Sequence, residues 1–208
     1  MMSPATLTPP LVCLASASPR RRELLEQIKV AHEIEAADVD EARLPGEVPR
    51  AYVLRLAREK ALSVQSRRPP GQPVLAADTA VVLEESVFGK PRDRQDAFEM
   101  LTALGGRNHQ VLTAVALAAR STVATALSVS TVRLRVLTQA ERSAYWQSGE
   151  PCDKAGAYAI QGLGAVFVEC LSGSYSGVMG LPLFETAQLL EAAGVPCGAR
   201  VQFAAGRA

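Results

Sequence analysis

Histidine is scarce in this chain of 208 residues, which contains only His32 and His109. No CxxC spacing connects its four cysteines, which are Cys13, Cys152, Cys170 and Cys197. A Cys/His zinc site is therefore not expected, and reduced thiols are the expected state of the cysteines. Two histidines also leave little room for a Ser-His-Asp triad, and the chain has no GxSxG elbow.

The chain also lacks a charge excess, a membrane-spanning apolar run and a basic N-terminus. It has 22 basic and 21 acidic residues, and its first ten residues contain three prolines and no basic side chain. These absences argue against general attraction to nucleic acid, against insertion into a membrane and against a secretory signal. We expect a cytoplasmic protein without nucleic-acid or membrane partners; the sequence leaves a homodimer open.

Familiar nucleotide-binding motifs are absent too. There is no GxxxxGK[ST], and Gly162-Leu-Gly164 lacks the third glycine and the following helix of a dinucleotide fingerprint. Periodicity predicts strands at residues 12–15, 32–36, 73–83, 110–118, 123–137 and 165–170, and helices at 19–28, 49–65, 93–104, 138–148 and 181–193. Because strands and helices mix without a βαβ rhythm, we expect an α/β fold with a mixed, strongly curved sheet.

A basic turn opens the first predicted helix. Pro19 suits a first helical position, which makes Ser18 the expected N-cap. Three arginines follow, although the helix dipole disfavours positive charge there. Helical geometry places Arg21 on the apolar face, Arg20 at its edge and Arg22 away from it. Free backbone N–H groups beside these arginines suit a phosphate, although a solvated basic turn explains this stretch alone equally well.

Polar residues also interrupt apolar patterns elsewhere. Asp78 lies inside an apolar strand, where a carboxylate needs a cation, a metal or a functional cleft, unless it caps backbone N–H groups. Thr79, on the opposite face, is by itself an ordinary strand threonine. Lys60 falls at the centre of a helical apolar stripe, from which it could snorkel outward or reach an anion. Lys90 is held in a turn between a glycine and a proline.

Taken together, these residues predict one carboxylate base among four cations: Asp78 with Arg20, Arg21, Lys60 and Lys90. Glu41 and Asp40, in an acidic loop, could add oxygen ligands for Mg²⁺, although a hydrophilic loop explains them as well. A base, a hard metal and several cations point to hydrolysis of a phosphoanhydride.

Six segments, in the same order, resemble the Maf proteins, a family of nucleoside triphosphate pyrophosphatases. They are Leu14-Ala-Ser-Ala-Ser-Pro-Arg-Arg-Arg-Glu-Leu-Leu, Leu56-Ala-Arg-Glu-Lys60-Ala, Ala77-Asp78-Thr79, Gly89-Lys90-Pro91, Lys154-Ala-Gly-Ala-Tyr-Ala-Ile-Gln161-Gly, and Gly173-Ser-Tyr with Val178-Met-Gly-Leu-Pro-Leu. The resemblance covers about residues 11 to 192. It implies one Maf-type domain over residues 1–208, with its core at 11–193 and with the first ten residues and the tail after 198 peripheral.

The resemblance also implies a fold and a reaction. The fold is a curved mixed sheet with two lobes around a nucleotide cleft, shared with the inosine triphosphate pyrophosphatases. The reaction is NTP plus water to NMP plus pyrophosphate, and it depends on a divalent metal. In the mechanism that we expect for this chain, Asp78 and Glu41 hold Mg²⁺ or Mn²⁺. Asp78 matches the proton acceptor, and Glu41 matches an additional acidic residue. The residues of this chain that match the family's phosphate-contacting set are Ser16, Arg20, Arg21, Lys60 and Lys90.

Within the family, Arg20, Thr79 and Gln161 match the specificity positions of the branch that hydrolyses dTTP and UTP. A glutamine amide can pair with the O4/N3–H edge of thymine or uracil, because it offers a donor and an acceptor together. The alternatives are a 7-methyl-GTP or inosine-type pyrophosphatase on the same fold, or a nucleotide-binding regulator of septum formation whose hydrolysis is incidental.

Overall fold

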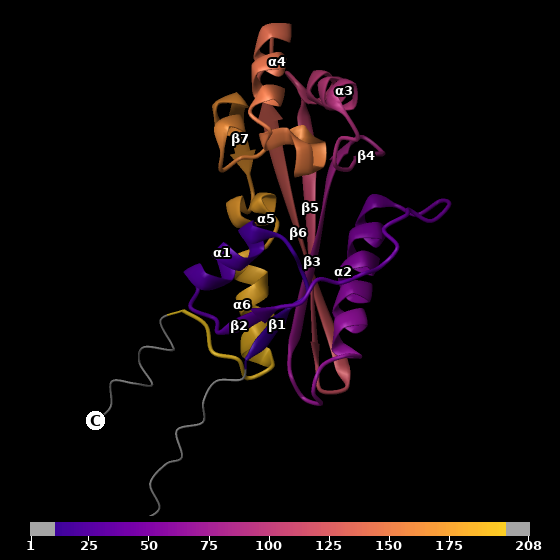
Figure 1. Cartoon of the computed structure of the whole chain (residues 1–208), viewed down its shortest axis with the longest axis vertical. Coiled ribbons are helices and arrows are strands. Elements are labelled where there is room, and N and C mark those ends of the chain that lie inside the picture. Colours follow the sequence, from indigo (N-terminus) through magenta and orange to yellow (C-terminus); the bar gives the residue numbers. More distant parts are fainter. Residues whose placement is uncertain (1–10, 199–208) are drawn as a thin grey trace, which may run out of the picture.

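A mixed seven-stranded sheet forms the centre of the computed structural model, which describes residues 11–198 (Figure 1). The strands are β1 (Val12–Leu14), β2 (His32–Ile34), β3 (Val74–Leu83), β4 (Ser86–Phe88), β5 (Asn108–Ala119), β6 (Thr122–Leu134) and β7 (Val168–Ser172). The helices are α1 (Pro19–Gln27), α2 (Pro49–Gln65), α3 (Arg94–Leu104), α4 (Gln139–Gln147), α5 (Tyr175–Met179) and α6 (Leu183–Ala192). Strand order is β2-β1-β3-β5-β6-β7, with β4 also paired to β3. The predicted α/β class with a mixed sheet is confirmed.

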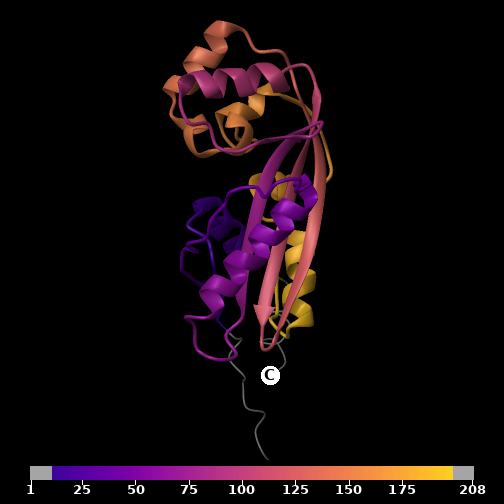
Figure 2. The ribbon, with the colours of Figure 1, turned by 90° about the vertical axis from the view of Figure 1, so that its right-hand side faces the viewer.

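Long strands connect two groups of helices (Figure 2). At one end, alternate residues of β3 and β5 face α2, and the intervening residues face α1 and α6. At the other end, α3 and α4 pack over the far parts of β3, β5 and β6. Because both faces are covered in this way, β3 is almost continuously apolar, which is the pattern seen in its sequence.

One edge of β3 is open in the middle, and this opening places the site. On that edge β1 pairs with β3 only as far as Leu75, and β4 begins to pair at Val81. Residues 76–80 therefore have no strand partner there among residues 11–198, while their other edge pairs continuously with β5. Side chains from both faces of β3 can reach the opening.

The bounds of one helix and the caps of two others confirm local predictions. Helix α2 has the predicted bounds, Asp93 caps α3 through its side chain, and Thr138 forms a capping box with Glu141. All four cysteines are free thiols. Within residues 11–198, no helix combines the length and apolar character that a membrane crossing requires.

Other local predictions are wrong. The strand expected at 165–170 starts at Val168, because Leu163–Phe167 forms a 3-10 helix. Strand β6 ends at Leu134, beyond a register shift against β7, and not at residue 137, so Val136 lies outside the strand and is exposed. The prediction that Ser18 is the N-cap of α1 is confirmed, although its hydroxyl makes no capping bond. Strand β4 and helix α5 were not anticipated. The first ten residues and the tail after 198 lie outside the described residues.

Candidate active site

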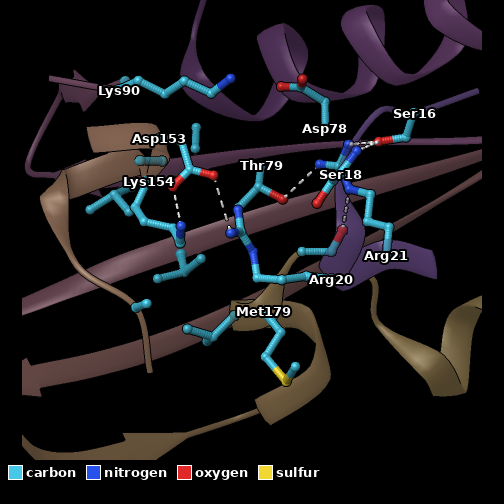
Figure 3. Close-up of a pocket in the computed structure, with 18 of the residues that line it drawn as sticks. Ser16, Ser18, Arg20, Arg21, Asp78, Thr79, Lys90, Asp153, Lys154 and Met179 are labelled. Carbon is cyan, nitrogen blue, oxygen red and sulfur yellow. Dashed lines mark hydrogen bonds and ion pairs between the residues drawn. The ribbon is translucent and has the colours of Figure 1, made fainter. Parts of the chain in front are cut away.

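A single cleft of about 510 Å³ collects all nine predicted site residues at the opening beside β3. They come from six parts of the chain, and they are Ser16, Arg20, Arg21, Glu41, Lys60, Asp78, Thr79, Lys90 and Gln161. Figure 3 labels six of them. The structure thus brings these nine residues together. Asp40, the other possible Mg²⁺ ligand of the acidic loop, does not line the cleft, and its Oδ1 accepts from the backbone N–H of Ala42. The individual roles of these residues stay predictions.

Lys60 forms the centre of the charged part of the cleft. Its ammonium donates to Asp78 Oδ1 at 2.6 Å and lies 2.5 Å from Glu41 Oε1. Lys60 and Asp78 are both buried, whereas the Glu41 side chain is more than half exposed. The lysine in the apolar stripe of α2 therefore does not snorkel to the surface. It crosses the stripe to a carboxylate on the face of β3 that packs against α2.

The pKa values of Asp78 and Glu41 are shifted in opposite directions. Burial raises the pKa of Asp78, and the charge of Lys60 only partly opposes this. Burial also acts to raise the pKa of Glu41, but the hydrogen bond and the charge of Lys60 outweigh it, so that this pKa lies below its ordinary value. Two neighbouring carboxyls with divergent pKa values are typical of a site that divides acid–base roles. Asp78 is the more basic carboxylate of the pair.

The turn before α1 is built around the hydroxyl of Ser16. This buried oxygen accepts from the backbone N–H of Ser18 at 3.2 Å and from Arg21 Nη1 at 3.1 Å. A serine that bonds to the N–H two residues later stabilises a tight turn. The hydroxyl thereby fixes both the backbone at the helix N-terminus and the guanidinium beside it.

Arg21 is also held from the opposite wall of the cleft. Its Nε donates to the Gly180 carbonyl at 2.8 Å, and its Nη2 lies 3.4 Å from Thr79 Oγ1. Burial lowers the pKa of Arg21, and the Asp78 carboxylate opposes this change. Gly180 has φ of 115°, a left-handed conformation that favours glycine at the end of α5.

Thr79 joins this arginine to α5 through a relay of hydroxyls. Thr113 donates its only hydroxyl proton to the Gly177 carbonyl at 2.8 Å, so Thr79 must donate across the 3.0 Å to Thr113. The hydroxyl oxygen of Thr79 remains free to accept from Arg21. Asp78 and Thr79 project from opposite faces of β3 and both reach the cleft, because β3 has an open edge at this point.

Asp153 and Lys154 also line the cleft, and we did not predict either one as a site residue. Asp153 Oδ2 lies 3.5 Å from Arg20 Nη1, and its other oxygen accepts from Lys154 (Figure 3). Lys154 begins the family segment that ends at Gln161, and this position in the motif could have identified it as a site residue. Asp153 carried no such signal, because its contact with Arg20 spans 133 positions of the chain.

The lining suits a ligand with one anionic and one flat apolar part. Five cationic side chains and three carboxylates line the cleft, an excess of positive charge in a chain whose net charge is only +1. Phe88, Tyr158 and Met179 add apolar surface. Cations of this kind balance phosphates, and aromatic surface accommodates a nucleobase.

The donor set can accommodate a divalent cation. Mg²⁺ commonly uses one or two carboxylates together with water and substrate phosphates, and Asp78 and Glu41 supply two carboxylates on one side of the cleft. Within residues 11–198 no group of three or more His, Cys, Asp and Glu side chains could hold a metal. Water and phosphate would therefore complete the coordination, and Lys60 engages only one oxygen of each carboxylate.

Comparison with known proteins assigns the class. A family model described as Maf-like protein matches residues 11–193, so the chain belongs to the Maf family. It is 57% identical over 188 residues to a dTTP/UTP pyrophosphatase of Anaeromyxobacter sp., with 88% of this chain and 89% of that protein covered. A protein of the same name from Bordetella avium is 52% identical over 194 residues, with 89% and 96% covered.

Solved structures give a more distant likeness. The Ham1 protein of Staphylococcus aureus matches with a TM-score of 0.41 and 11% identity, covering 60% of this chain and 71% of that one. A HAM1 protein from Coxiella burnetii matches with 0.40 and 18%, covering 60% and 72%. TM-scores this low do not identify a family, so the family assignment depends on the sequence matches.

Proposed function

We propose that this protein is a nucleoside triphosphate pyrophosphatase that hydrolyses dTTP and UTP to the nucleoside monophosphate and pyrophosphate. The observation that carries the proposal is the cleft, in which a buried carboxylate with a raised pKa lies among cations from four separate segments. The names of the relatives agree with the pyrimidine branch expected from Arg20, Thr79 and Gln161.

Asp78 acts on the attacking water in this proposal. Its raised pKa makes it a stronger base than an ordinary aspartate, and burial keeps it in place beside Lys60. It orients the water and accepts its proton during attack at the α–β linkage. The product pyrophosphate leaves from the cation-lined part of the cleft.

The cations offset the charge that develops on the leaving group. Arg21 is already aligned by Ser16 and Gly180, so it needs little reorganisation when phosphate arrives. Lys60 and Lys90 approach from α2 and from the turn after β4, on the side of Asp78. Asp78 and Glu41 would hold Mg²⁺ or Mn²⁺, which when bound acidifies a water molecule and neutralises phosphate oxygens.

The nucleobase is selected by Gln161 and Arg20. Gln161 is an exposed residue of the cleft lining in the segment that also carries Lys154, while Asp153 steadies Arg20. The Gln161 amide can satisfy both the carbonyl O4 and the N3–H of a pyrimidine. Thr79 contributes indirectly, because its hydroxyl is engaged by Arg21 and Thr113. Cytoplasmic location and dimerisation stay predictions from the sequence.

A substrate panel tests the proposal. Pyrophosphate release is measured with dTTP, UTP, dCTP, GTP, 7-methyl-GTP and ITP, each with Mg²⁺, with Mn²⁺ and with chelator. We expect release from dTTP and UTP that depends on the metal. Preferred hydrolysis of 7-methyl-GTP or ITP would assign one of the purine alternatives. Release from no nucleotide would favour the regulator of septum formation.

A further inference from the structure

The loop that carries Glu41 has no regular structure of its own. Residues 35–48, between β2 and α2, contain neither helix nor strand, and Glu41 lies near the middle. A carboxylate on such a loop contributes to a preorganised site only if the loop backbone is fixed. The structure shows how it is fixed: Arg55 and Glu47, which make most of the attachments, lie outside the lining of the cleft, and Tyr52 is part of that lining.

Arg55 of α2 makes the principal attachment. Its Nε and Nη2 donate to the two carboxylate oxygens of Glu47 at 2.7 and 2.8 Å, which is a bidentate pair. Its Nη2 also donates to the carbonyl of Ala42 at 3.0 Å, and its Nη1 donates to Glu59 at 3.1 Å. The side chains of Arg55 and Glu47 are only 20% and 8% exposed, so water competes little for these bonds.

Glu47 transmits this attachment into the loop. Its Oε2 also accepts from the backbone N–H of Leu44 at 3.1 Å, and its carbonyl accepts from Arg43 at 2.7 Å. The hydrogen bond from Arg55 lowers the pKa of Glu47 to about 2, so this carboxylate stays ionised at neutral pH. The arginine, the glutamate and the loop backbone thus form one closed network.

Tyr52 completes the attachment at Glu41 itself. Its hydroxyl donates to the Glu41 carbonyl at 3.0 Å, and the Arg55 guanidinium lies 5.7 Å from its ring centre. The loop backbone is therefore held at Glu41 by Tyr52 and at Ala42 by Arg55. The same helix supplies Lys60, whose ammonium meets the Glu41 carboxylate.

We infer that Arg55 and Glu47 form a clamp that positions Glu41 for the reaction, with Tyr52 as its second contact. The inference rests on the proposed function, because the contribution of Glu41 is measured as turnover. Arg55 is not part of the lining of the cleft, so it is a positioning residue. A lysine could not replace it, because a single ammonium cannot reproduce the planar pair of bonds to Glu47 together with the bonds to Ala42 and Glu59.

A double-mutant cycle tests the clamp. Arg55→Lys is expected to lower kcat by on the order of tenfold, as small misplacements of catalytic groups do. In a Glu41→Gln background the same change is expected to have almost no further effect, because the residue that it positions is already inactive. Equal losses in both backgrounds would overturn the inference. Arg58→Lys, an exposed arginine of the same helix, is the matched control and is expected to behave like the wild type.

Hydrogen exchange gives a second readout that does not need turnover. In Arg55→Lys, amides of residues 38–46 are expected to exchange faster than in the wild type, while those of α2 keep their protection. Glu47→Gln, which leaves α2 unchanged in sequence, is expected to give the same pattern if Arg55→Lys does not fold. Unchanged exchange in the loop would contradict the clamp. A wild-type protein without pyrophosphatase activity would contradict the proposed function, and the exchange data would still decide whether the clamp exists.

Discussion

Removal of the Lys60 ammonium tests the electrostatic arrangement of the cleft independently of substrate. Lys60→Met keeps most of the side-chain length but leaves the buried Asp78 carboxylate without its partner. Breaking a buried ion pair on one side costs about 3–5 kcal/mol. We therefore expect the free energy of unfolding to fall by about that amount at pH 8, a large part of the total stability of an ordinary domain.

The loss should depend on pH. Burial already raises the pKa of Asp78 against the opposing charge of Lys60, so the variant should raise it further. A carboxyl whose pKa is higher in the folded than in the unfolded state binds more protons when folded, and stability falls as pH rises between those two values. Each pH unit within this window accounts for about 1.4 kcal/mol. The variant should consequently be less destabilised at pH 5 than at pH 8.

Urea unfolding, followed by the fluorescence of the single tryptophan, Trp146, measures both quantities. The double variant Lys60→Met with Asp78→Asn should regain most of the lost stability, because no buried charge remains. Arg58→Met, on the exposed face of the same helix, is the matched control. If Lys60→Met lowers the free energy of unfolding by less than about 1 kcal/mol at pH 8, the pair behaves like an exposed ion pair and the reasoning is refuted. An equal loss of stability at pH 5 and pH 8 would refute it as well.

Further predictions concern turnover. Asp78→Asn should lower kcat by about 10²–10⁴-fold while dTTP still binds in calorimetry; near-normal kcat would show that another group serves as the base. In the wild type the acid limb of the kcat/KM profile should lie above the 3.8 of an unperturbed aspartate, because burial raises this pKa, and a limb at or below that value would disagree. Arg21→Lys should lower kcat by about 10²-fold, whereas Arg22→Lys should leave kcat unchanged in the same steady-state assay. Equal effects of the two substitutions would show that the two arginines do not differ in role. Gln161→Glu should raise KM for UTP by about tenfold with less effect on kcat, because a carboxylate cannot donate to O4; an unchanged KM would exclude the proposed amide contact.

The sequence predicts the parts of this site that depend on local periodicity. Lys60 lies in the middle of the apolar stripe of α2, and the buried pair with Asp78 explains why a charge is tolerated there. Arg21 faces inward at the start of α1, as the helical geometry indicates, and Arg22 is exposed. Each of these predictions needs only the repeat of one helix or one strand.

Features that depend on distant pairing escaped prediction. The open edge of β3, which brings Asp78 and Thr79 into one cleft from opposite faces, follows from where β1 and β4 stop. Asp153 contacts Arg20 only in the folded chain, because 133 positions separate the two residues in the sequence. The short helix α5 is specified by its contacts with Arg21 and Thr113 rather than by any periodicity of its five residues.

The most direct test of the proposed function is the identity of the products formed from dTTP. The purified protein is incubated with dTTP and Mg²⁺, and the products are resolved by phosphorus NMR. Attack at the α–β linkage predicts dTMP and pyrophosphate in equal amounts, formed about 10²–10⁴-fold more slowly by Asp78→Asn. Formation of dTDP and inorganic phosphate, or no turnover of dTTP by the wild-type protein, would contradict the proposal.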